Sequence, residues 1–466
     1  MPFVYSVAPI GTMEQTEKQN GEWSPSSWRN CHAAQQPVYP DADALDSAVA
    51  ELAKLPPLVT SWEVETLKSE LAEASQGKRF LLQGGDCSES FADCESNTIT
   101  CKLKILLQMG LVLAQGARIP VIRVGRMAGQ YAKPRSADTE SVNGQTLPTY
   151  RGDMVNGAAA VAEERTPDPQ RLLRAYGRSA LTLNFIRSLT YGGFADLHHP
   201  ENWDLAFMGG SPRAADFTRR VHNIAESLQF VETLSGQSVP EITRVEFFTS
   251  HEGLHLPYEQ AQTRKVPRRT GFYNLSTHYP WIGERTRSLD GAHIEFFRGI
   301  ANPIGIKLGP SVSGDDALAL CEALNPQNEP GRLTFIHRFG ATKVEECLPR
   351  LVETIRREGR EIVWCCDPMH GNTETTADGV KTRRFDNIQK ELETAFTVLR
   401  DCGAHLGGLH VELTGENVTE CVGGAGGLTE AGLARDYRSS VDPRLNYEQA
   451  MELSLHLAHL MAESGT

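Results

Sequence analysis

The sequence has no CxxC pair and no dense group of cysteines, and its 10 cysteines are scattered along 466 residues. This spacing argues against a disulfide framework or a zinc ribbon, and it favours the reducing environment of the cytoplasm. No apolar run approaches the roughly 20 residues that cross a bilayer. Residues 1–15 lack the basic region and the long apolar region of a secretory signal. We therefore expect a cytoplasmic protein with no membrane partner.

Basic residues are also in deficit. The chain has 46 Lys and Arg against 59 Asp and Glu, a formal net charge of −13. Nucleic acids bind basic surfaces, so this balance argues against a nucleic-acid partner. The signatures GxxxxGKS/T and strand-following GxGxxG are missing, which leaves no support for a P-loop or a dinucleotide fold. The glycine-rich run 423–427 has no strand-to-helix context and is interpreted as a flexible loop.

The sequence does contain eight short stretches rich in Val, Ile, Leu and Phe, most of which run into a charged residue, His or Cys. They span residues 80–87, 120–126, 245–252, 271–278, 303–308, 333–338, 362–370 and 408–412. Continuous apolar runs separated by helix-length segments are typical of parallel strands buried on both faces. Eight of them predict an α/β fold of the (β/α)8 TIM-barrel type. Active sites of that fold lie at the C-terminal rim, and the predicted rim residues are Cys87, Arg126, Glu252, His278, Lys307, Arg338, His370 and Glu412.

The remaining segments predict additions to this barrel. Residues 1–77 are expected to form an N-terminal extension that packs on the barrel and on a subunit interface, with Thr60 and Glu63 as a capping box. Residues 78–466 are expected to form the catalytic barrel. The gap between the second and third stretches is too long for one helix. It predicts a helical insertion at about 156–240, with helices around 171–189 and 217–234 that either pad the barrel or enclose a regulatory pocket.

Four residue types suited to a metal ion fall on separate segments. Cys87, His370 and Glu412 end predicted strands, and Asp442 lies in a loop after the last one. A thiolate, an imidazole and two carboxylates can hold a borderline divalent ion such as Mn, Co, Fe or Zn. A mixed set with room for water suits Lewis-acid catalysis better than a structural zinc site. Each residue alone has an ordinary explanation, such as a buried thiol or a turn-capping Asp, but their coincidence favours a metal.

Basic side chains form a second group near the same strand ends, made up of Arg126, Lys133, Arg135, Arg285, Lys307 and Arg338. Isolated Lys and Arg are mostly solvated, but Lys307 is embedded in the apolar run 304–308, where an ammonium needs a negative partner. The group therefore predicts an anionic substrate that carries phosphate or carboxylate. Its size allows two anions, whereas a metal-dependent aldolase or phosphatase on the same barrel would need cations for one phosphate only.

Longer motifs at these positions resemble those of a known family. The segments QGGDCSESF, RVGRMAGQYAKPRS, WIGERTR, GIKLGP, CDPMHGNT, HVELTGENVTECVGG and DPRLN resemble the type II 3-deoxy-D-arabino-heptulosonate 7-phosphate (DAHP) synthases over most of the chain. The resemblance implies a TIM-barrel transferase that condenses phosphoenolpyruvate with D-erythrose 4-phosphate and releases phosphate. This is the first step of the shikimate pathway to aromatic amino acids. A catalytically retired regulatory barrel is disfavoured, because no ligand or substrate Arg is lost.

The resemblance also implies roles for individual residues. It assigns one divalent metal ion, Mn or Co with Fe or Zn as alternatives, to Cys87, His370, Glu412 and Asp442. It assigns phosphoenolpyruvate to Arg126, Glu284, Arg285, Lys307 and Arg338, and erythrose 4-phosphate to Lys133, Arg135 and Ser136. The expected catalytic residues are Lys133, Glu284, Lys307 and His370. In this scheme Glu284 positions the attacking water, and Lys133 or a metal-bound water protonates the new hydroxyl.

Regulation and assembly are expected from the resemblance alone. Aromatic amino acids are expected to inhibit the enzyme through a site formed by the N-terminal extension and the inserted helices. The chain is expected to form a homodimer or a homotetramer, and chorismate mutase is a candidate partner.

Overall fold

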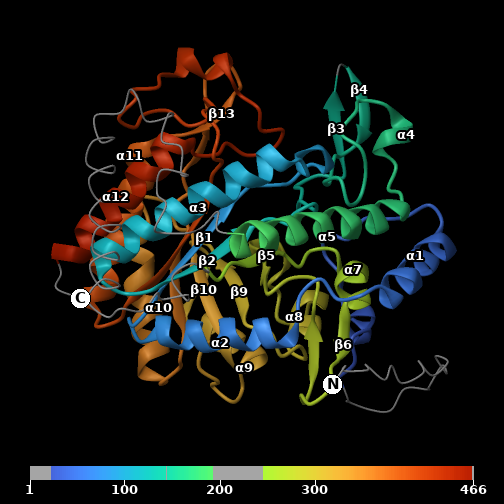
Figure 1. The fold of residues 1–466 in the computed structure, drawn as a ribbon, viewed down its shortest axis with the longest axis horizontal. Helices are drawn as coiled ribbons and strands as arrows, with labels where there is room; N and C mark the ends of the chain where they lie inside the picture. The colour runs from blue at the N-terminus through green and yellow to red at the C-terminus, as the bar shows by residue number, and fades with distance from the viewer. Residues whose placement is uncertain (1–22, 143, 193–244, 464–466) are drawn as a thin grey trace.

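A computed structural model describes residues 23–142, 144–192 and 245–463. Eight parallel strands close a barrel in the hydrogen-bonded order β1-β14-β11-β10-β9-β8-β5-β2 (Figure 1). They are β1 (Phe80–Gly85), β2 (Val121–Arg126), β5 (Phe248–Glu252), β8 (Tyr279–Ile282), β9 (Ile304–Leu308), β10 (Leu333–His337), β11 (Val363–Cys366) and β14 (Leu406–Glu412). This closed sheet confirms the predicted TIM barrel, and its parallel strands bring all eight C-terminal ends to one rim.

Helices follow the strands and cover the outside of the barrel (Figure 1). They are α3 (Ser96–Ala117), α5 (Gln170–Tyr191), α7 (Leu256–Ala261), α8 (Ala292–Phe297), α9 (Gly314–Leu324), α10 (Val344–Arg357), α11 (Phe385–Asp401) and α12 (Tyr447–Glu463). Each longer helix buries an apolar stripe. On α10, for example, Val344, Leu348, Leu351 and Ile355 recur at intervals of three or four residues and are buried. Burial of each such side chain stabilises the fold by about 1.5–3 kcal/mol.

The N-terminal extension closes the end of the barrel opposite the rim. Helix α2 (Ser61–Ser75) begins at the predicted capping box, in which the Thr60 hydroxyl and the Glu63 carboxylate each accept a hydrogen bond from the other residue's backbone N–H. Its buried Leu67 and Leu71 join the apolar cluster of the barrel interior. Helix α2 also contacts β1, β2, β11 and β14. Helix α2 therefore covers the N-terminal end of the barrel and leaves the C-terminal rim open.

The prediction that residues 271–278 form the fourth barrel strand is wrong. Residues Phe272–Asn274 form β7, which pairs antiparallel with β6 (Thr263–Lys265) outside the barrel, and the barrel strand is the next apolar run, β8. The run YPWI is short and contains Pro280, a residue that normally argues against an interior strand. His278 consequently lies before β8 and not at the rim. Its Nδ1 accepts a hydrogen bond from the backbone N–H of Thr249 at 2.9 Å.

The insertion after β2 is only partly within the described residues. Helix α5 confirms the helix expected around 171–189, and it packs against α1 (Ala42–Lys54) and α3. The helix expected around 217–234 lies outside the described residues. The regulatory role of the insertion and the domain boundaries stay predictions.

The shorter elements are β3 (Thr139–Val142), β4 (Gln145–Pro148), α4 (Ala162–Arg165), β12 (Thr373–Thr375), β13 (Lys381–Arg383), η1 (Ser27–Asn30), η2 (Phe91–Asp93), η6 (Glu284–Thr286) and η7 (Glu430–Arg435).

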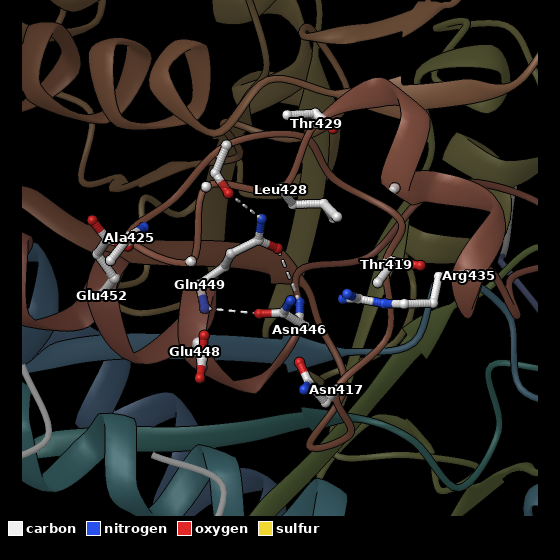
Figure 2. Close-up of a pocket in the computed structure, with 14 residues that line it drawn as sticks. Asn417, Thr419, Ala425, Leu428, Thr429, Arg435, Asn446, Glu448, Gln449 and Glu452 are labelled. Carbon is white, nitrogen blue, oxygen red and sulfur yellow. Dashed lines mark hydrogen bonds between the residues drawn. The ribbon is translucent and has the colours of Figure 1, made fainter. Parts of the chain in front are cut away.

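The glycine-rich run 423–427 forms a loop against the start of α12. Three of its glycines have φ values of +94°, +81° and +61°, which other residues adopt only with strain. The Gln449 side chain of α12 donates hydrogen bonds to the carbonyls of Cys421 (2.8 Å) and Gly423 (3.1 Å). The loop and α12 enclose a cavity of about 250 Å³ (Figure 2), whose lining includes none of the predicted site residues.

Helix α3 has the length and hydropathy of a membrane span. However, 67% of its most apolar window is buried inside the protein. It packs against α12 and β2 as part of the helical layer. Among the described residues it is the only helix that meets this test, and its burial indicates a core helix.

Candidate active site at the barrel rim

One cavity at the rim receives a side chain from the end of every barrel strand. Its lining includes seven of the eight predicted rim residues, namely Cys87, Arg126, Glu252, Lys307, Arg338, His370 and Glu412. Four residues predicted from loop motifs line it as well: Lys133, Glu284, Arg285 and Asp442. The cavity has a volume of about 190 Å³. The eighth predicted rim residue, His278, is absent because its strand was assigned wrongly.

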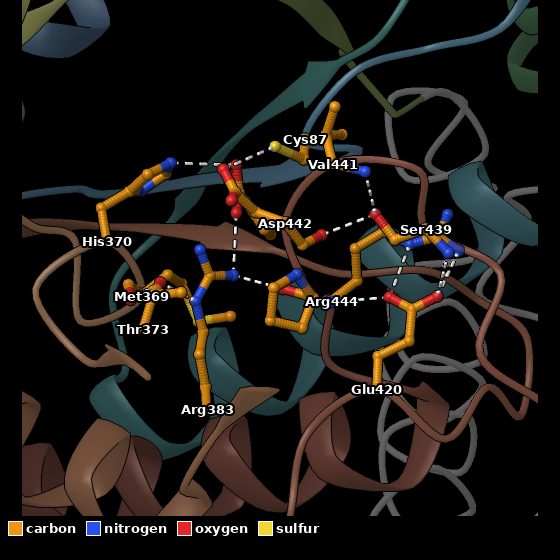
Figure 3. Close-up of polar contacts among 12 residues, drawn as sticks. Cys87, Met369, His370, Thr373, Arg383, Glu420, Ser439, Val441, Asp442 and Arg444 are labelled. Carbon is orange, nitrogen blue, oxygen red and sulfur yellow. Dashed lines mark hydrogen bonds and ion pairs between the residues drawn. The ribbon is translucent and has the colours of Figure 1, made fainter. Parts of the chain in front are cut away.

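Three of the four predicted metal ligands form a tight group in this cavity, and the fourth, His370, lies beside Glu412. Suitable ligand atoms of Cys87, Glu412 and Asp442 all lie within 4.8 Å of one another. The Cys87 thiol donates to Asp442 Oδ2 at 3.4 Å, and His370 Nε2 lies 3.0 Å from Glu412 Oε1. Figure 3 shows the thiol, the imidazole and the Asp442 carboxylate pointing toward one another. Residues up to 355 positions apart in the chain thus present their donor atoms at one place.

The electrostatics of this ligand set keep its two acids ionised and its thiol protonated. Burial raises the pKa of the Cys87 thiol above its usual range, and the Glu412 charge adds to the effect. Burial opposes ionisation of Glu412 and Asp442, but neighbouring cations outweigh it and hold the pKa of each carboxyl low. A divalent ion would favour the thiolate and would be neutralised by these acids. One soft and three harder donors fit a borderline ion.

Glu412 is held by two guanidinium groups. Its Oε1 accepts a hydrogen bond from Arg126 Nη2 at 3.0 Å, and its Oε2 lies 2.8 Å from Arg383 Nη1. Arg126 also donates to the Asp86 carbonyl at 3.1 Å and lies 5.1 Å over the Trp281 ring. All of these charged groups are buried. Arg126 is therefore bound mainly by protein groups, and it fixes Glu412 in the ligand set.

Lys307 is paired with Asp367, a fully buried carboxylate that follows β11. The Lys307 ammonium contacts Asp367 Oδ2, and the same oxygen accepts a hydrogen bond from His370 Nδ1 at 2.8 Å. This bond leaves His370 Nε2 directed at the ligand set. Burial lowers the pKa of Lys307 to about 8, with Arg126 adding repulsion and Asp367 opposing the shift. Asp367 thus links the ammonium to the imidazole that is predicted to bind the metal.

Lys133 lies between two of the predicted metal ligands. Its ammonium contacts Cys87 Sγ and donates to Asp442 Oδ2 at 2.7 Å. Burial opposes its charge, but Cys87, Asp442 and Glu412 outweigh burial and raise the pKa of Lys133. The side chain therefore stays cationic at neutral pH and is a strong hydrogen-bond donor.

Arg285 and Arg338 differ from the other cations because neither forms an ion pair within the described part of the chain. Arg285 Nη2 donates to the Ser136 hydroxyl at 3.0 Å, and Arg338 Nη2 donates to the His370 carbonyl at 2.8 Å. Arg338 Nε is buried and has no hydrogen-bond partner among the described residues. Two guanidiniums with uncompensated charge face one cavity, which is the arrangement expected for binding an anion.

A second cavity adjoins the first and shares Lys133, Pro134, Arg285 and Asp442 with it. Its volume is about 570 Å³, and its lining includes the predicted residues Arg135 and Ser136. Arg135 is partly compensated, since its Nη2 lies 2.8 Å from Glu140 Oε2. Together the two cavities offer adjacent space for two anionic molecules, one beside Lys307 and one beside Ser136.

Comparison with known proteins agrees with this geometry. A sequence profile of the Class-II DAHP synthetase family matches residues 23–458. The chain belongs to the Class-II DAHP synthetase family. It is 49% identical over 445 residues to a phospho-2-dehydro-3-deoxyheptonate aldolase of Streptomyces coelicolor, covering 95% of this chain and 98% of that protein. Enzymes of the same name from Neurospora crassa (46% over 461 residues, 96% and 95%) and Mycolicibacterium smegmatis (45% over 436 residues, 92% and 93%) are also similar.

Sequence reasoning missed several polar residues of this Class-II DAHP synthetase site. Asp367 follows an apolar run just as Cys87 does, so the strand-end signal that identified Cys87 could have found it. Arg383 lies on the short polar hairpin β12–β13, which has no alternating apolar pattern. Lys381 begins the same hairpin strand, β13, and Gln130 lies in a loop, where spacing gives no information about side-chain direction.

Proposed function

We propose that this chain condenses phosphoenolpyruvate with D-erythrose 4-phosphate and water to give DAHP and inorganic phosphate, as the first step of the shikimate pathway. The observation that carries the proposal is the coexistence, in one rim cavity, of a thiol–imidazole–carboxylate set and cations whose charge is not compensated within the protein. The first set suits a Lewis acid, and the second suits an anionic partner for the aldehyde. Family membership gives the reaction its identity.

Cys87, His370, Glu412 and Asp442 would hold one divalent ion, with Mn or Co as first choices and Fe or Zn as alternatives. When bound, this ion supplies Lewis-acid polarisation of the aldehyde carbonyl of erythrose 4-phosphate. Asp367 supports the set by fixing the His370 ring through Nδ1. Arg126 and Arg383 limit the negative charge of the set by pairing with Glu412.

Arg285, Arg338 and Lys307 would bind the phosphate and carboxylate of phosphoenolpyruvate. Planar guanidiniums suit bidentate contacts to both groups, and the Lys307 ammonium lies at the same cavity wall. Holding both ends of the molecule orients C3 toward the aldehyde carbon of the second substrate, and this orientation removes much of the entropic cost of a bimolecular reaction. Arg135 and Ser136 would bind erythrose 4-phosphate in the adjoining cavity.

Bond formation at C3 leaves positive charge at C2, to which water adds. Glu284 lies in the cavity wall, has a buried oxygen without a hydrogen-bond partner among the described residues, and would position this water. The adduct then releases phosphate. Lys133 would donate a hydrogen bond to the oxygen that becomes the new hydroxyl. Because its pKa is raised, Lys133 suits charge stabilisation better than complete proton transfer.

A coupled assay tests the proposal. Loss of phosphoenolpyruvate that requires both erythrose 4-phosphate and a divalent ion supports the condensation. Hydrolysis of phosphoenolpyruvate without the aldehyde would indicate a phosphatase instead, and inactivity despite bound metal would indicate a retired barrel. Arg338→Met should raise the KM for phosphoenolpyruvate by about 10- to 100-fold, since a charge-assisted hydrogen bond contributes about 1.5–3 kcal/mol. Arg350→Met is the control, because that side chain is 78% exposed.

Family membership also supports a cytoplasmic location, a homodimer or homotetramer, and inhibition by aromatic amino acids, with chorismate mutase as a candidate partner. Activity measured near KM with Phe, Tyr and Trp, singly and combined, tests the regulation. Unchanged activity under every combination would refute it.

A further inference from the structure

Arg444 joins two loops from opposite ends of the sequence. Its Nη1 lies 2.7 Å from Asp86 Oδ1, while its Nε and Nη2 lie 3.1 Å and 2.8 Å from the two oxygens of Glu420. Figure 3 shows the paired contacts between Arg444 and Glu420. The side chains of Asp86 and Glu420 are 1% and 0% exposed. The guanidinium thus bridges two buried carboxylates.

Each of these carboxylates holds a loop that carries a proposed metal ligand. Asp86 directly precedes Cys87, and its other oxygen contacts the Lys102 ammonium of α3. Glu420 accepts hydrogen bonds from the backbone N–H groups of Ser439 (2.9 Å) and Arg444 (2.7 Å), which flank Asp442 on either side. The Asp86 contact therefore fixes the Cys87 loop, and the Glu420 contacts fix the Asp442 loop.

Asp442 needs such support more than the other three ligands do. Cys87, His370 and Glu412 lie at or just after barrel strands, but Asp442 lies in a loop before α12. Its carboxylate must stay near Cys87, now 3.4 Å away, although 355 positions separate the two residues. A planar guanidinium with two fixed edges sets the distance between two carboxylates more tightly than a flexible ammonium would.

We propose that Arg444 is a positioning residue for the metal site, which holds the Cys87 loop and the Asp442 loop at the separation that the ion requires. Arg444 lines neither rim cavity, so it acts through Asp86 and Glu420. The inference rests on the proposed metal-dependent condensation and names a determinant of metal affinity within it. Partners of this kind typically change metal affinity by 10- to 100-fold.

Cobalt binding to the metal-free full-length protein tests the role. Titration with Co(II), followed by the absorbance of the thiolate-to-cobalt charge transfer, reports both affinity and the presence of the Cys87 sulfur. Arg444→Met should weaken Co(II) binding by about 10- to 100-fold, and Arg444→Lys should weaken it less. With saturating metal, kcat should change far less than the affinity does, because Arg444 does not touch substrate.

Arg438→Met is the matched control. Arg438 lies in the same loop, but its side chain is 50% exposed and pairs with Asp436 and Glu416 instead of the bridge. It should leave Co(II) affinity unchanged. Equal affinities for wild type and Arg444→Met would overturn the inference, and so would equal losses in Arg444→Met and Arg438→Met.

Loss of Arg444 alone leaves the buried Glu420 without its counter-ion, which could unfold the chain. The double variant Arg444→Met/Glu420→Gln removes both charges, and circular dichroism checks that it folds. It should show the same weakened Co(II) binding. If only Arg444→Lys folds, a Co(II) affinity equal to wild type would still refute the role. A wild-type protein that binds no Co(II) through sulfur, or that does not condense the substrates, would instead refute the proposed function.

Discussion

Replacing Asp367 with Asn should make substrate binding depend on pH in a new range. Asp367 is fully buried, and its charge opposes the loss of the proton from Lys307. The pKa of Lys307 is already lowered to about 8, mainly by burial. Asn has nearly the same shape but carries no charge, and only one of its two polar side-chain atoms accepts hydrogen bonds. If its oxygen replaces Oδ2, it still accepts from His370 Nδ1, but its amide group then replaces Oδ1, which accepts from the backbone N–H groups of Met369 (3.0 Å) and His370 (3.2 Å). The substitution therefore removes the charge beside Lys307 and also weakens the turn that carries His370, and only the first effect depends on pH.

The size of the effect follows from the pKa values. An opposite charge within contact distance shifts a pKa by about 1–3 units, so the pKa of Lys307 should fall to roughly 5–7 in the variant. Lysine is charged only below its pKa, so Lys307 becomes mostly neutral at pH 7. With a neutral Lys307, kcat/KM for phosphoenolpyruvate at pH 7 should fall by up to about 100-fold, one factor of ten for each unit by which the pKa lies below the pH.

The fold should survive this change. In wild type, holding the pKa of Lys307 at about 8 instead of 10.5 already costs on the order of 3 kcal/mol. At pH 7 the penalty cannot exceed that of a fully neutral lysine, on the order of 5 kcal/mol. The lysine therefore adds at most roughly 2 kcal/mol to the loss of stability. Because the unfolded chain binds a proton that the folded variant does not, the free energy of unfolding should rise with pH between the two pKa values.

The assay is kcat/KM for phosphoenolpyruvate from pH 5.5 to 9 at saturating metal and aldehyde. The ratio of variant to wild type cancels the titration of the substrate itself. Wild type should lose activity as pH rises through about 8, and Asp367→Asn should lose it at a pH about 1–3 units lower. Asp401→Asn, at a side chain that is 61% exposed, should match wild type. A ratio that is low and constant at every pH would refute the reasoning, because Asp367 would then act only by orienting His370.

Three further predictions concern the ligand set and its support. Cys87→Ser should abolish the thiolate-to-cobalt absorbance, whereas the outlying Cys347→Ser should retain it. Burial raises the pKa of the Cys87 thiol, so cobalt binding to wild type should release a proton, and the affinity for cobalt should increase about tenfold per pH unit. Calorimetry in buffers of different ionisation enthalpy measures the proton release. A cobalt affinity that does not depend on pH would contradict the prediction. Glu391→Ala should lower the free energy of unfolding, measured by urea denaturation, by about 3 kcal/mol or more. The substitution leaves the buried backbone N–H groups of Phe339 and Gly340 without a hydrogen-bond acceptor. A change below about 1 kcal/mol would contradict the prediction.

The barrel could be predicted because its strands are buried on both faces. Such strands appear in the sequence as continuous apolar runs, and the helices between them set the spacing. The prediction failed for the fourth strand, where FYNLSTHYPWI contains two apolar runs and the strand is the one with a proline. Periodicity cannot choose between two short runs, since the choice depends on which of them pairs with β5 and β9. Because of this error, His278 was predicted at the rim. Glu284 and Arg285 were not recognised as residues that directly follow a barrel strand, β8.

The site was predicted less completely, because strand ends identify charged residues but not their partners. The apolar run around Lys307 indicated that an anion must compensate the ammonium, and substrate was the expected source. Asp367 supplies that anion within the protein, from a different strand. Arg383 and Arg126 do the same for Glu412. A buried charge requires a partner, but the partner is chosen by tertiary geometry. Of the six predicted cations, Arg285 and Arg338 are the two without a carboxylate partner among the described residues. We therefore expect these two guanidiniums, together with the charge on Lys307, to contribute most of the affinity for an anionic substrate.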